Sequence, residues 1–405
     1  MDTIEILNIS TYVDDITLNF INSKTTEGFS PSVAAIKYAK LIRMGLMDNN
    51  DVSVKNLYLP IIAPFPYSSI KFFGPKKVEN GRYIPFLNVM IVKQICTSAF
   101  IFLYALIWII RKIRQRKIII LSSIQLPFLL GVFLLKIFNV KIVSFVPDMP
   151  HYQFSYSVEK HSLKKLLIPF YIWFTSRMFF CIDFFVFITK YQKSFFPRKP
   201  SVIVEGFVDK NTWSHSSHSV LSDTFNIMYA GGLYEKYGLK MLIDAFLCIN
   251  DSKCRLWLFG VGDMTEYIKL CSQKDPRIIF YGNCTNNEVL AYEKKASLLV
   301  NPRFSNHDFT YYSFPSKLME YMASGTPVLT TKLAGIPSDY NDKMFFFDEE
   351  TIEGFRGKIE FCIQLDDNTR RSFGKSAQRY VFENKNNITQ LDYILQNIMK
   401  LYSHS

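Results

Sequence analysis

The sequence predicts an α/β fold made of two Rossmann-like domains with parallel sheets that face a central cleft. The chain has 405 residues, 49% of them hydrophobic, whereas one domain typically takes about 100–200 residues. Short apolar runs alternate with helical patterns, as strand, crossover helix, strand units require. The polar, Ser- and His-rich segment 210–223 is typical of a linker between two cores.

The first half, predicted as a domain over residues 1–208, opens with the apolar run IEILNIS at 4–10, which indicates a strand. A helical pattern over 28–42 predicts a helix entered through a loop, with Ser30 as its cap and Pro31 in its first turn. In that loop Gly28 would let the backbone approach a phosphate, although a plain turn explains it equally well. Further strands are expected at 118–121, 141–146, 184–188 and 202–204.

The second half, predicted as a domain over 209–385, repeats this alternation more regularly. Near-continuous apolar runs are expected for strands of a parallel sheet covered by helices on both faces. They occur at 225–231, 254–260, 277–282, 296–302, 326–331 and 344–348. Ligands of such sheets bind beyond the carboxyl ends of the strands, so the cleft is the expected site.

Charge is distributed unevenly along the chain. Residues 1–210 hold 26 Lys and Arg against 13 Asp and Glu, whereas the remainder is nearly balanced, and the net charge is +12. This half is also rich in aliphatic residues, which favours a membrane surface or a lipid phosphate over nucleic acid, for which no motif is present. Lys160, Lys164 and Lys165 beside LLIPFYIWF suit phospholipid headgroups or a polyprenyl diphosphate, with a solvated charge run as the alternative.

Three apolar stretches are candidate membrane spans. Ile95–Ile110 has 16 residues where about 20 are needed, Ile118–Leu135 crosses Pro127, and Leu166–Ile188 crosses Pro169. We therefore expect buried or membrane-surface helices, while at least one real span stays an open alternative.

The location of the protein is inferred from its N-terminus and its cysteines. The first residues show no signal-peptide pattern. Seven scattered Cys without a CxxC pair indicate a reducing compartment and no structural zinc. We expect a cytoplasmic protein, peripheral at the inner face of the plasma membrane.

The segment 301–329 carries the most chemistry. A helix is predicted to begin after Ser313 and to end at Gly325. Lys317 then lies in the first turn, where a cation opposes the helix dipole unless an anion is bound there. Glu320, one turn on, could accept hydrogen bonds from a ribose diol. An exposed Lys317–Glu320 pair is the alternative.

Two further turns are candidate site elements. Gly260 and Gly262 follow a predicted strand and permit a tight turn beside a base or a diphosphate, or one that is only structural. Asp148 and His151 follow another strand, where either could accept the proton of an acceptor hydroxyl. A His after a strand is also often only a surface residue.

Taken together, the chain resembles family 4 retaining glycosyltransferases of GT-B architecture, which build bacterial surface polysaccharides such as capsule or O-antigen. The resemblance covers nearly the whole chain and is strongest in the second half. It is carried by YAGGLYEKYGLKMLIDAF (229–246), LWLFGVGD (256–263), IIFYGNCTNNEVLAYEKKASLLVNPR (278–303), SFPSKLMEYMASGTPVL (313–329) and AGIPSDY (334–340). It implies that a helix of about 386–405 packs back on the first domain.

The resemblance also implies donor binding by the second domain. Glu320 matches the Glu that holds the nucleotide ribose, but Tyr312 stands where a second Glu is usual, so Asp308 is a candidate carboxylate instead. The phosphate-binding Arg and Lys of the family's GR-L...KG pattern are missing, because the chain has Gly231-Gly232-Leu233 and Tyr237-Gly238 at the matching positions. A diphosphate leaving group needs about two positive partners. The remaining donor candidates are Arg303 and Lys317 as replacement cations, with Ser313 and Ser316 at the helix start.

The predicted function is transfer of a sugar from a nucleotide diphosphate sugar to a saccharide acceptor. The hypothesis we favour is that this acceptor is linked to a lipid. Configuration would be retained, and no metal or other cofactor is expected. A nucleotide-sugar epimerase on the same scaffold and a non-catalytic, membrane-docked scaffold of a polysaccharide assembly complex stay open.

Overall fold

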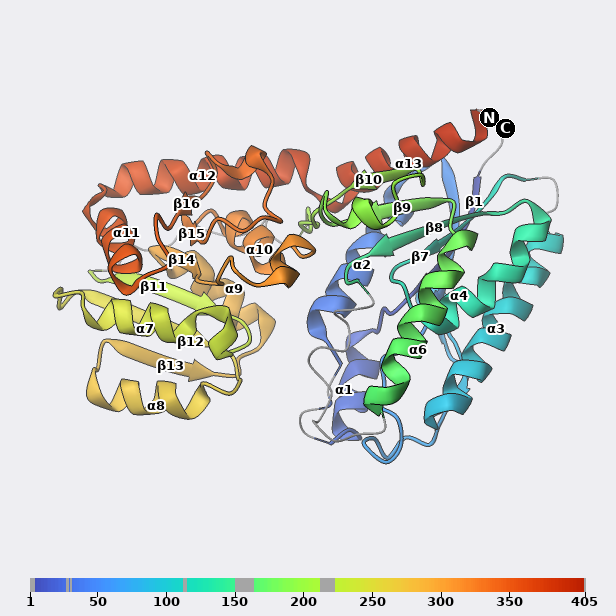
Figure 1. Ribbon diagram of the computed structural model, residues 1–405, viewed down its shortest axis with the longest axis horizontal. Helices are drawn as coiled ribbons and strands as arrows, with labels where there is room; N and C mark the ends of the chain where they lie inside the picture. The colour runs from blue at the N-terminus through green and yellow to red at the C-terminus, as the bar shows by residue number, and fades with distance from the viewer. Residues whose placement is uncertain are drawn as a thin grey trace. The chain divides into compact units, whose positions relative to one another are not determined.

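The computed structural model describes residues 4–26, 29, 31–111, 115–149, 164–211 and 223–403. The chain divides into two compact units, one made of 1–207 with 387–405 and one made of 208–386. Each unit is built on its own sheet (Figure 1). The predicted α/β fold with two parallel-sheet domains is confirmed.

The first unit holds an eight-stranded sheet in which all pairs are parallel except β4 with β5. Its order is β10 (Ser201–Ile203), β9 (Phe184–Phe187), β8 (Lys141–Val146), β7 (Lys117–Leu121), β1 (Ile4–Ser10), β2 (Val52–Tyr58), β5 (Gly81–Tyr83) and β4 (Lys77–Val78). A small antiparallel ribbon pairs β3 (Phe72–Phe73) with β6 (Phe86–Leu87).

Helices cover both faces of this sheet. They are α1 (Asp15–Ser23), α2 (Val33–Asp48), α3 (Met90–Arg111), α4 (Leu126–Val132), α6 (Lys164–Arg177) and α13 (Asn387–Ser403), with the 3-10 turns η1 (Phe133–Phe138), η2 (Met178–Cys181) and η3 (Gln192–Phe195). α3, α4 and α6 lie next to one another on one side of the sheet (Figure 1). On the other side α2 packs against α13 so closely that a Cβ on Gly45 would lie 2.4 Å from the carbonyl oxygen of Asn387.

The start of α2 differs from the prediction. Its cap is Ser32, whose Oγ accepts a hydrogen bond from the N–H of Ala35 at 3.3 Å. Ser32 therefore takes the role that the sequence assigned to Ser30, which lies outside the described residues.

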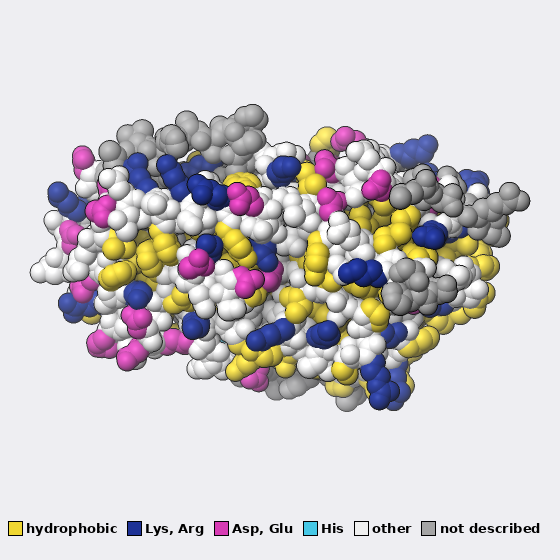
Figure 2. All heavy atoms as spheres, turned by 90° about the horizontal axis from the view of Figure 1, so that it is seen from above, with side chains coloured by type: hydrophobic (Ala, Val, Ile, Leu, Met, Phe, Trp, Pro, Cys, Tyr) yellow, Lys and Arg dark blue, Asp and Glu magenta, His cyan; other side chains and the backbone are white. Residues whose placement is uncertain are grey.

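The apolar stretches also differ in one respect. Ile118–Leu135 becomes β7, α4 and part of η1, as expected for a strand, loop and helix. Ile95–Ile110, however, belongs to the longer helix α3 of 22 residues. In the described part of the chain α3 is the one helix whose length and composition would allow a span. Many hydrophobic side chains stay on the molecular surface (Figure 2).

The second unit holds a six-stranded, fully parallel sheet. Its order is β13 (Ile278–Gly282), β12 (Cys254–Phe259), β11 (Phe225–Ala230), β14 (Leu298–Asn301), β15 (Val328–Thr330) and β16 (Phe345–Phe346). Its helices are α7 (Leu239–Leu247), α8 (Thr265–Lys274), α9 (Asn286–Lys295), α10 (Ser316–Ser324), α11 (Ile352–Gln364) and α12 (Asp367–Asn384), with the 3-10 turns η4 (Glu235–Tyr237), η5 (Asp308–Tyr311) and η6 (Ser338–Tyr340). α10 packs against α9 and α12, and α7 packs against α11.

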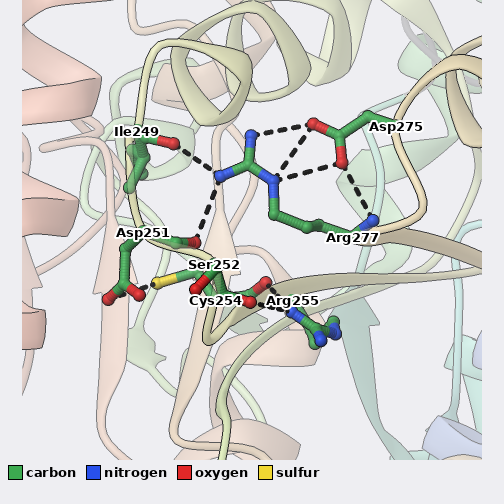
Figure 3. A network of polar contacts seen from close by, with 7 residues as sticks. All are labelled: Ile249, Asp251, Ser252, Cys254, Arg255, Asp275 and Arg277. Atoms are coloured by element: carbon green, nitrogen blue, oxygen red, sulfur yellow. Dashed lines mark hydrogen bonds and ion pairs between the residues drawn. The ribbon is translucent and has the colours of Figure 1, made fainter.

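Arg277 ties together the loops at the amino ends of β12 and β13 (Figure 3). Its guanidinium pairs with Asp275 at 2.8 Å and donates to the carbonyl oxygens of Ile249 at 2.5 Å and Asp251 at 3.2 Å. The hydrogen bond from Arg277 lowers the pKa of Asp275. Because ligands of parallel sheets bind at the opposite, carboxyl ends of the strands, this network is structural.

Replacing Arg277 by Met should destabilise the second unit by about 1–3 kcal/mol, because partly buried carbonyl groups lose their donor. In the wild type the contribution of Asp275 is present above the unfolded pKa near 4 and is lost as the pH falls through its lowered folded value. Urea unfolding at pH 7 and pH 3 measures both effects. Lys269→Met removes an ion pair of similar length but high exposure, so it is the control. Equal losses in the two variants would contradict this role.

Candidate functional site

Three neighbouring strands of the second unit end in glycine- or proline-containing loops. β12, β11 and β14 are adjacent and parallel, so their carboxyl ends lie at the same edge of the sheet. Gly260 follows β12, Gly231 and Gly232 follow β11, and Arg303 follows β14 after one proline. The fold therefore gathers these predicted donor residues at one edge.

The glycines allow the loops to touch through their backbones. A Cβ on Gly260, whose φ is 128°, would lie 1.8 Å from the carbonyl oxygen of Gly231. A Cβ on Gly238 would lie 1.9 Å from the carbonyl oxygen of Pro302, and one on Gly262 would lie 2.2 Å from that of Leu233. A side chain at these positions would push the loops apart, so each glycine is needed for close packing.

Arg303 is stacked beside this edge. Its guanidinium carbon lies 4.5 Å from the ring centre of Tyr237 and 5.6 Å from that of Phe309. Its Nε is buried and has no hydrogen-bond partner among the described residues. Tyr237 occupies the position where the resemblance expects a Lys, so Arg303 brings a positive charge close to that position.

Lys236 is a second cation here that the sequence reasoning missed. Its ammonium lies 5.4 Å from the centre of the Tyr237 ring. Desolvation and the nearby charge of Arg303 lower its pKa, although the charge of Asp263 opposes this. Two cations that share one ring and repel each other favour a bound anion. Lys236 is adjacent in sequence to the expected Lys position, which is the signal that could have identified it.

α10 presents its N-terminus without a side-chain cap. Its N-cap is Pro315, which makes no capping hydrogen bond, and the helix ends before Gly325. The helix was predicted to begin directly after Ser313, but Ser313 lies before the N-cap, and its Oγ donates to the carbonyl oxygen of Phe309 at 2.9 Å. Ser316 and Lys317 lie in the first turn as predicted. The first N–H groups of a helix lack intrahelical partners and attract anions.

Lys317 lies between two carboxylates rather than in an open anion site. It is paired with Glu320 on its own helix, and its ammonium lies 3.5 Å from the carboxylate of Glu293 on α9. Glu293 is fully buried, and the side chain of Glu320 is 9% exposed. Desolvation lowers the pKa of Lys317, but the charges of Glu320 and Glu293 outweigh it and raise the pKa. The alternative hypothesis of an exposed Lys317–Glu320 pair is therefore wrong: the pair exists, but Glu320 is largely buried.

Tyr321 fixes α10 relative to the glycine loop. Its buried hydroxyl accepts from the N–H of Ala230 at 2.8 Å and donates to the carbonyl oxygen of the same residue at 3.1 Å. Ala230 is the last residue of β11, directly before Gly231. The side chain next to Glu320 therefore sets the position of that helix.

The other predicted residues lie elsewhere or outside the description. Asp308 is exposed at the start of η5, and Tyr312 follows this turn. Asp148 follows β8 in the first unit, where desolvation raises its pKa although part of the residue stays exposed.

Several sequence-based candidates fall where the structure gives no description. Gly28, His151 and Lys160 lie outside the described residues. Lys164 and Lys165 begin α6, but their side chains are not described. Within the described ranges, no three His, Cys, Asp or Glu side chains are grouped to hold a metal ion.

Comparison with known proteins matches residues 224–364 to the family described as glycosyl transferases group 1. An uncharacterized glycosyltransferase of Methanocaldococcus jannaschii is 30% identical over 124 residues, which is 30% of each protein. The aligned part thus spans under a third of that relative.

Two solved structures align along nearly the whole chain. Sucrose-phosphate synthase from Thermosynechococcus elongatus has a TM-score of 0.66 and 15% identity, with 99% of this chain and 100% of that chain covered. Anabaena HepE in complex with UDP has a TM-score of 0.59 and 12% identity, with 98% and 100% covered. At these identities the likeness establishes the fold, which is GT-B.

Replacing Lys317 by Met should lower the free energy of unfolding by about 1–3 kcal/mol, because the buried carboxylate of Glu293 loses its nearby cation. Adding Glu293→Gln should recover most of that loss. Urea unfolding of the two single variants and the double variant measures the coupling between these side chains. A double variant whose loss equals the sum of the single losses would show that the pair does not interact.

Proposed function

We propose that the protein is a glycosyltransferase that moves a sugar from a nucleotide diphosphate sugar to a saccharide hydroxyl, with retention, in cell-surface polysaccharide synthesis. The observation that carries this proposal is the arrangement at one edge of the second unit. It comprises the Arg303 guanidinium, whose Nε has no hydrogen-bond partner in the described part of the chain, and glycine loops that pack through their backbones. It also comprises α10, which has no side-chain cap at its N-terminus and carries the largely buried Glu320.

In this proposal the diphosphate binds to Arg303 and Lys236 and to the first N–H groups of α10, while Glu320 accepts hydrogen bonds from the ribose hydroxyls. Lys317 orients Glu320 and adds positive charge to the first turn. Gly231, Gly232, Gly260 and Gly262 provide the close backbone approach. The match of 224–364 to glycosyl transferases group 1 and the UDP held by the structurally similar HepE support this assignment.

We assign the acceptor to the first unit. The buried hydroxyls of Ser10 and Ser122 have no hydrogen-bond partner among the described residues. They lie at the carboxyl ends of the adjacent strands β1 and β7, where sugar hydroxyls could pair with them. Asp148, with its raised pKa, is the proposed proton acceptor. His151 is a second proposed proton acceptor, and Gly28 is proposed to let the backbone approach a phosphate. The patch of Lys160, Lys164 and Lys165 is a proposed contact for a lipid-linked acceptor at the inner membrane face.

The reaction breaks the bond between the anomeric carbon and the diphosphate oxygen, and the electron pair leaves with the diphosphate. The acceptor oxygen forms the new bond on the same face of the sugar and loses its proton. Arg303, Lys236 and the N-terminus of α10 stabilise the departing negative charge, so the chain itself supplies the electrophilic help and no metal is required. Asp308 is exposed and lies four positions before Tyr312 in the sequence. We propose that its carboxylate lies near the transferred sugar.

Arg303→Ala should weaken UDP binding about tenfold to a hundredfold, because a charge-assisted contact to the diphosphate is lost. Isothermal titration of the full chain with UDP, GDP and dTDP measures the affinity and identifies the base. Arg356→Ala, at an exposed cation on α11, is the matched control and should bind like the wild type. If the Arg303 variant binds UDP with wild-type affinity, the diphosphate does not bind to Arg303.

Release of nucleoside diphosphate only in the presence of acceptor separates transfer from epimerisation. An epimerase would convert the donor without releasing it, and a non-catalytic scaffold would do neither.

A further inference from the structure

The outer side of α3 is a continuous apolar stripe. Ile91, Ile95, Ala99, Leu103 and Ile107 recur every four residues, which places them on one side of the helix. Each of the four large side chains is at least half exposed, from 50% for Ile107 to 66% for Ile91. A stripe of this length on the surface is unusual for a protein in water and marks a contact site.

The inner side of α3 packs on the protein. Thr97, Ile101, Ala105 and Trp108 are buried. A Cβ on Gly131 of α4 would lie 2.6 Å from the side chain of Ile101, and Ser98 donates to the carbonyl oxygen of Pro127 at 3.2 Å. Since one side of α3 packs on α4 and the other side is exposed, the helix can place its stripe on a membrane surface.

Neighbouring elements extend this apolar surface. η1 and η2 contact α4 and each other, and the N–H of Leu126 lies 3.4 Å from the hydroxyl of Tyr171 on α6. Ile137 of η1 is 81% exposed, Phe180 of η2 67% and Trp173 of α6 54%. We call the exposed apolar side chains of α3, η1, α6 and η2 the α3 face. Hydrophobic side chains gather at the right-hand edge of Figure 2, with Lys and Arg nearby.

Cations gather near the α3 face, where the carboxylate of Asp183, just after η2, is paired with Lys136 of η1 at 2.6 Å. Between Glu79 and Asp148 the sequence has nine Lys and Arg and no acidic residue. Arg111 ends α3 and is exposed, and the exposed Arg177 of α6 lies 5.6 Å from the ring centre of Trp173. An apolar stripe bordered by cations complements an anionic lipid surface, where cations meet headgroups and apolar side chains enter the acyl boundary.

We propose that the α3 face docks the first unit on the surface of a bilayer that contains anionic phospholipid, with α3 lying in the plane of the interface. This goes beyond the proposed sugar transfer, because vesicle binding requires neither donor nor acceptor. It also differs from the Lys160, Lys164 and Lys165 patch, because the main contact is apolar and lies on α3.

The test is flotation of the full chain with vesicles of phosphatidylcholine alone and of equal parts phosphatidylcholine and phosphatidylglycerol. The wild type should float with the anionic vesicles, and added salt should reduce the bound fraction. The triple variant Ile95→Glu, Leu103→Glu, Ile107→Glu should lose at least tenfold in partitioning. The control triple Ile16→Glu, Leu247→Glu, Leu270→Glu introduces the same charges at exposed apolar positions outside the α3 face and should bind like the wild type.

A second measurement locates the contact. Lipids with brominated acyl chains should quench the fluorescence of Trp173, and Trp173→Phe should remove most of that quenching. Unchanged UDP titration of the α3 variant shows that it is folded and separates this proposal from the proposed function.

Three results would overturn the proposal. The first is equal flotation of the α3 and control triples. The second is a concentration-dependent dimer that the α3 triple abolishes while no vesicle is bound, which would make this face a contact between two copies of the chain. The third is vesicle binding that resists carbonate extraction, which would indicate a span.

Discussion

The hydroxyl of Tyr321 bonds both backbone groups of Ala230 and thereby fixes the candidate site. The helix that carries Lys317 and Glu320 is attached through it to the strand that leads into Gly231. Both hydrogen bonds are buried, where an unmade bond costs most. Without them neither the N-terminus of α10 nor the carboxylate of Glu320 would have a defined position relative to the glycine loops. The geometry of any bound donor depends on this contact.

The cations of the candidate site have two different environments. Arg303 and Lys236 both lie over the ring of Tyr237, whereas Lys317 lies between Glu320 and the buried Glu293. The two cations expected at the diphosphate therefore have different roles in our account. Arg303 takes the leaving group, and Lys317 holds the ribose-binding carboxylate in place. Loss of activity on removal of Lys317 would reflect charge imbalance as well as lost binding, so Arg303 is the cleaner probe.

Local patterns in the sequence predicted the fold class and a helix between Ser313 and Gly325, which the structure places at Ser316–Ser324, because strand periodicity and the Gly325 stop can be recognised over a few residues. They could not reveal Tyr321, whose partner lies 91 positions away, or Glu293, which in a run of charged residues looks solvated but is fully buried. The length of α3 was underestimated because Lys93 interrupts the apolar run. In the structure its ammonium donates to the carbonyl oxygen of Ile62 at 2.7 Å, so the helix continues through it.

The most direct test of the donor site is a crystal structure of the full chain with UDP. Our account predicts the diphosphate against Arg303 and the first turn of α10, with the ribose hydroxyls on the carboxylate of Glu320. A nucleotide bound elsewhere, with Arg303 still stacked on Tyr237 and Glu320 contacting only Lys317, would contradict it.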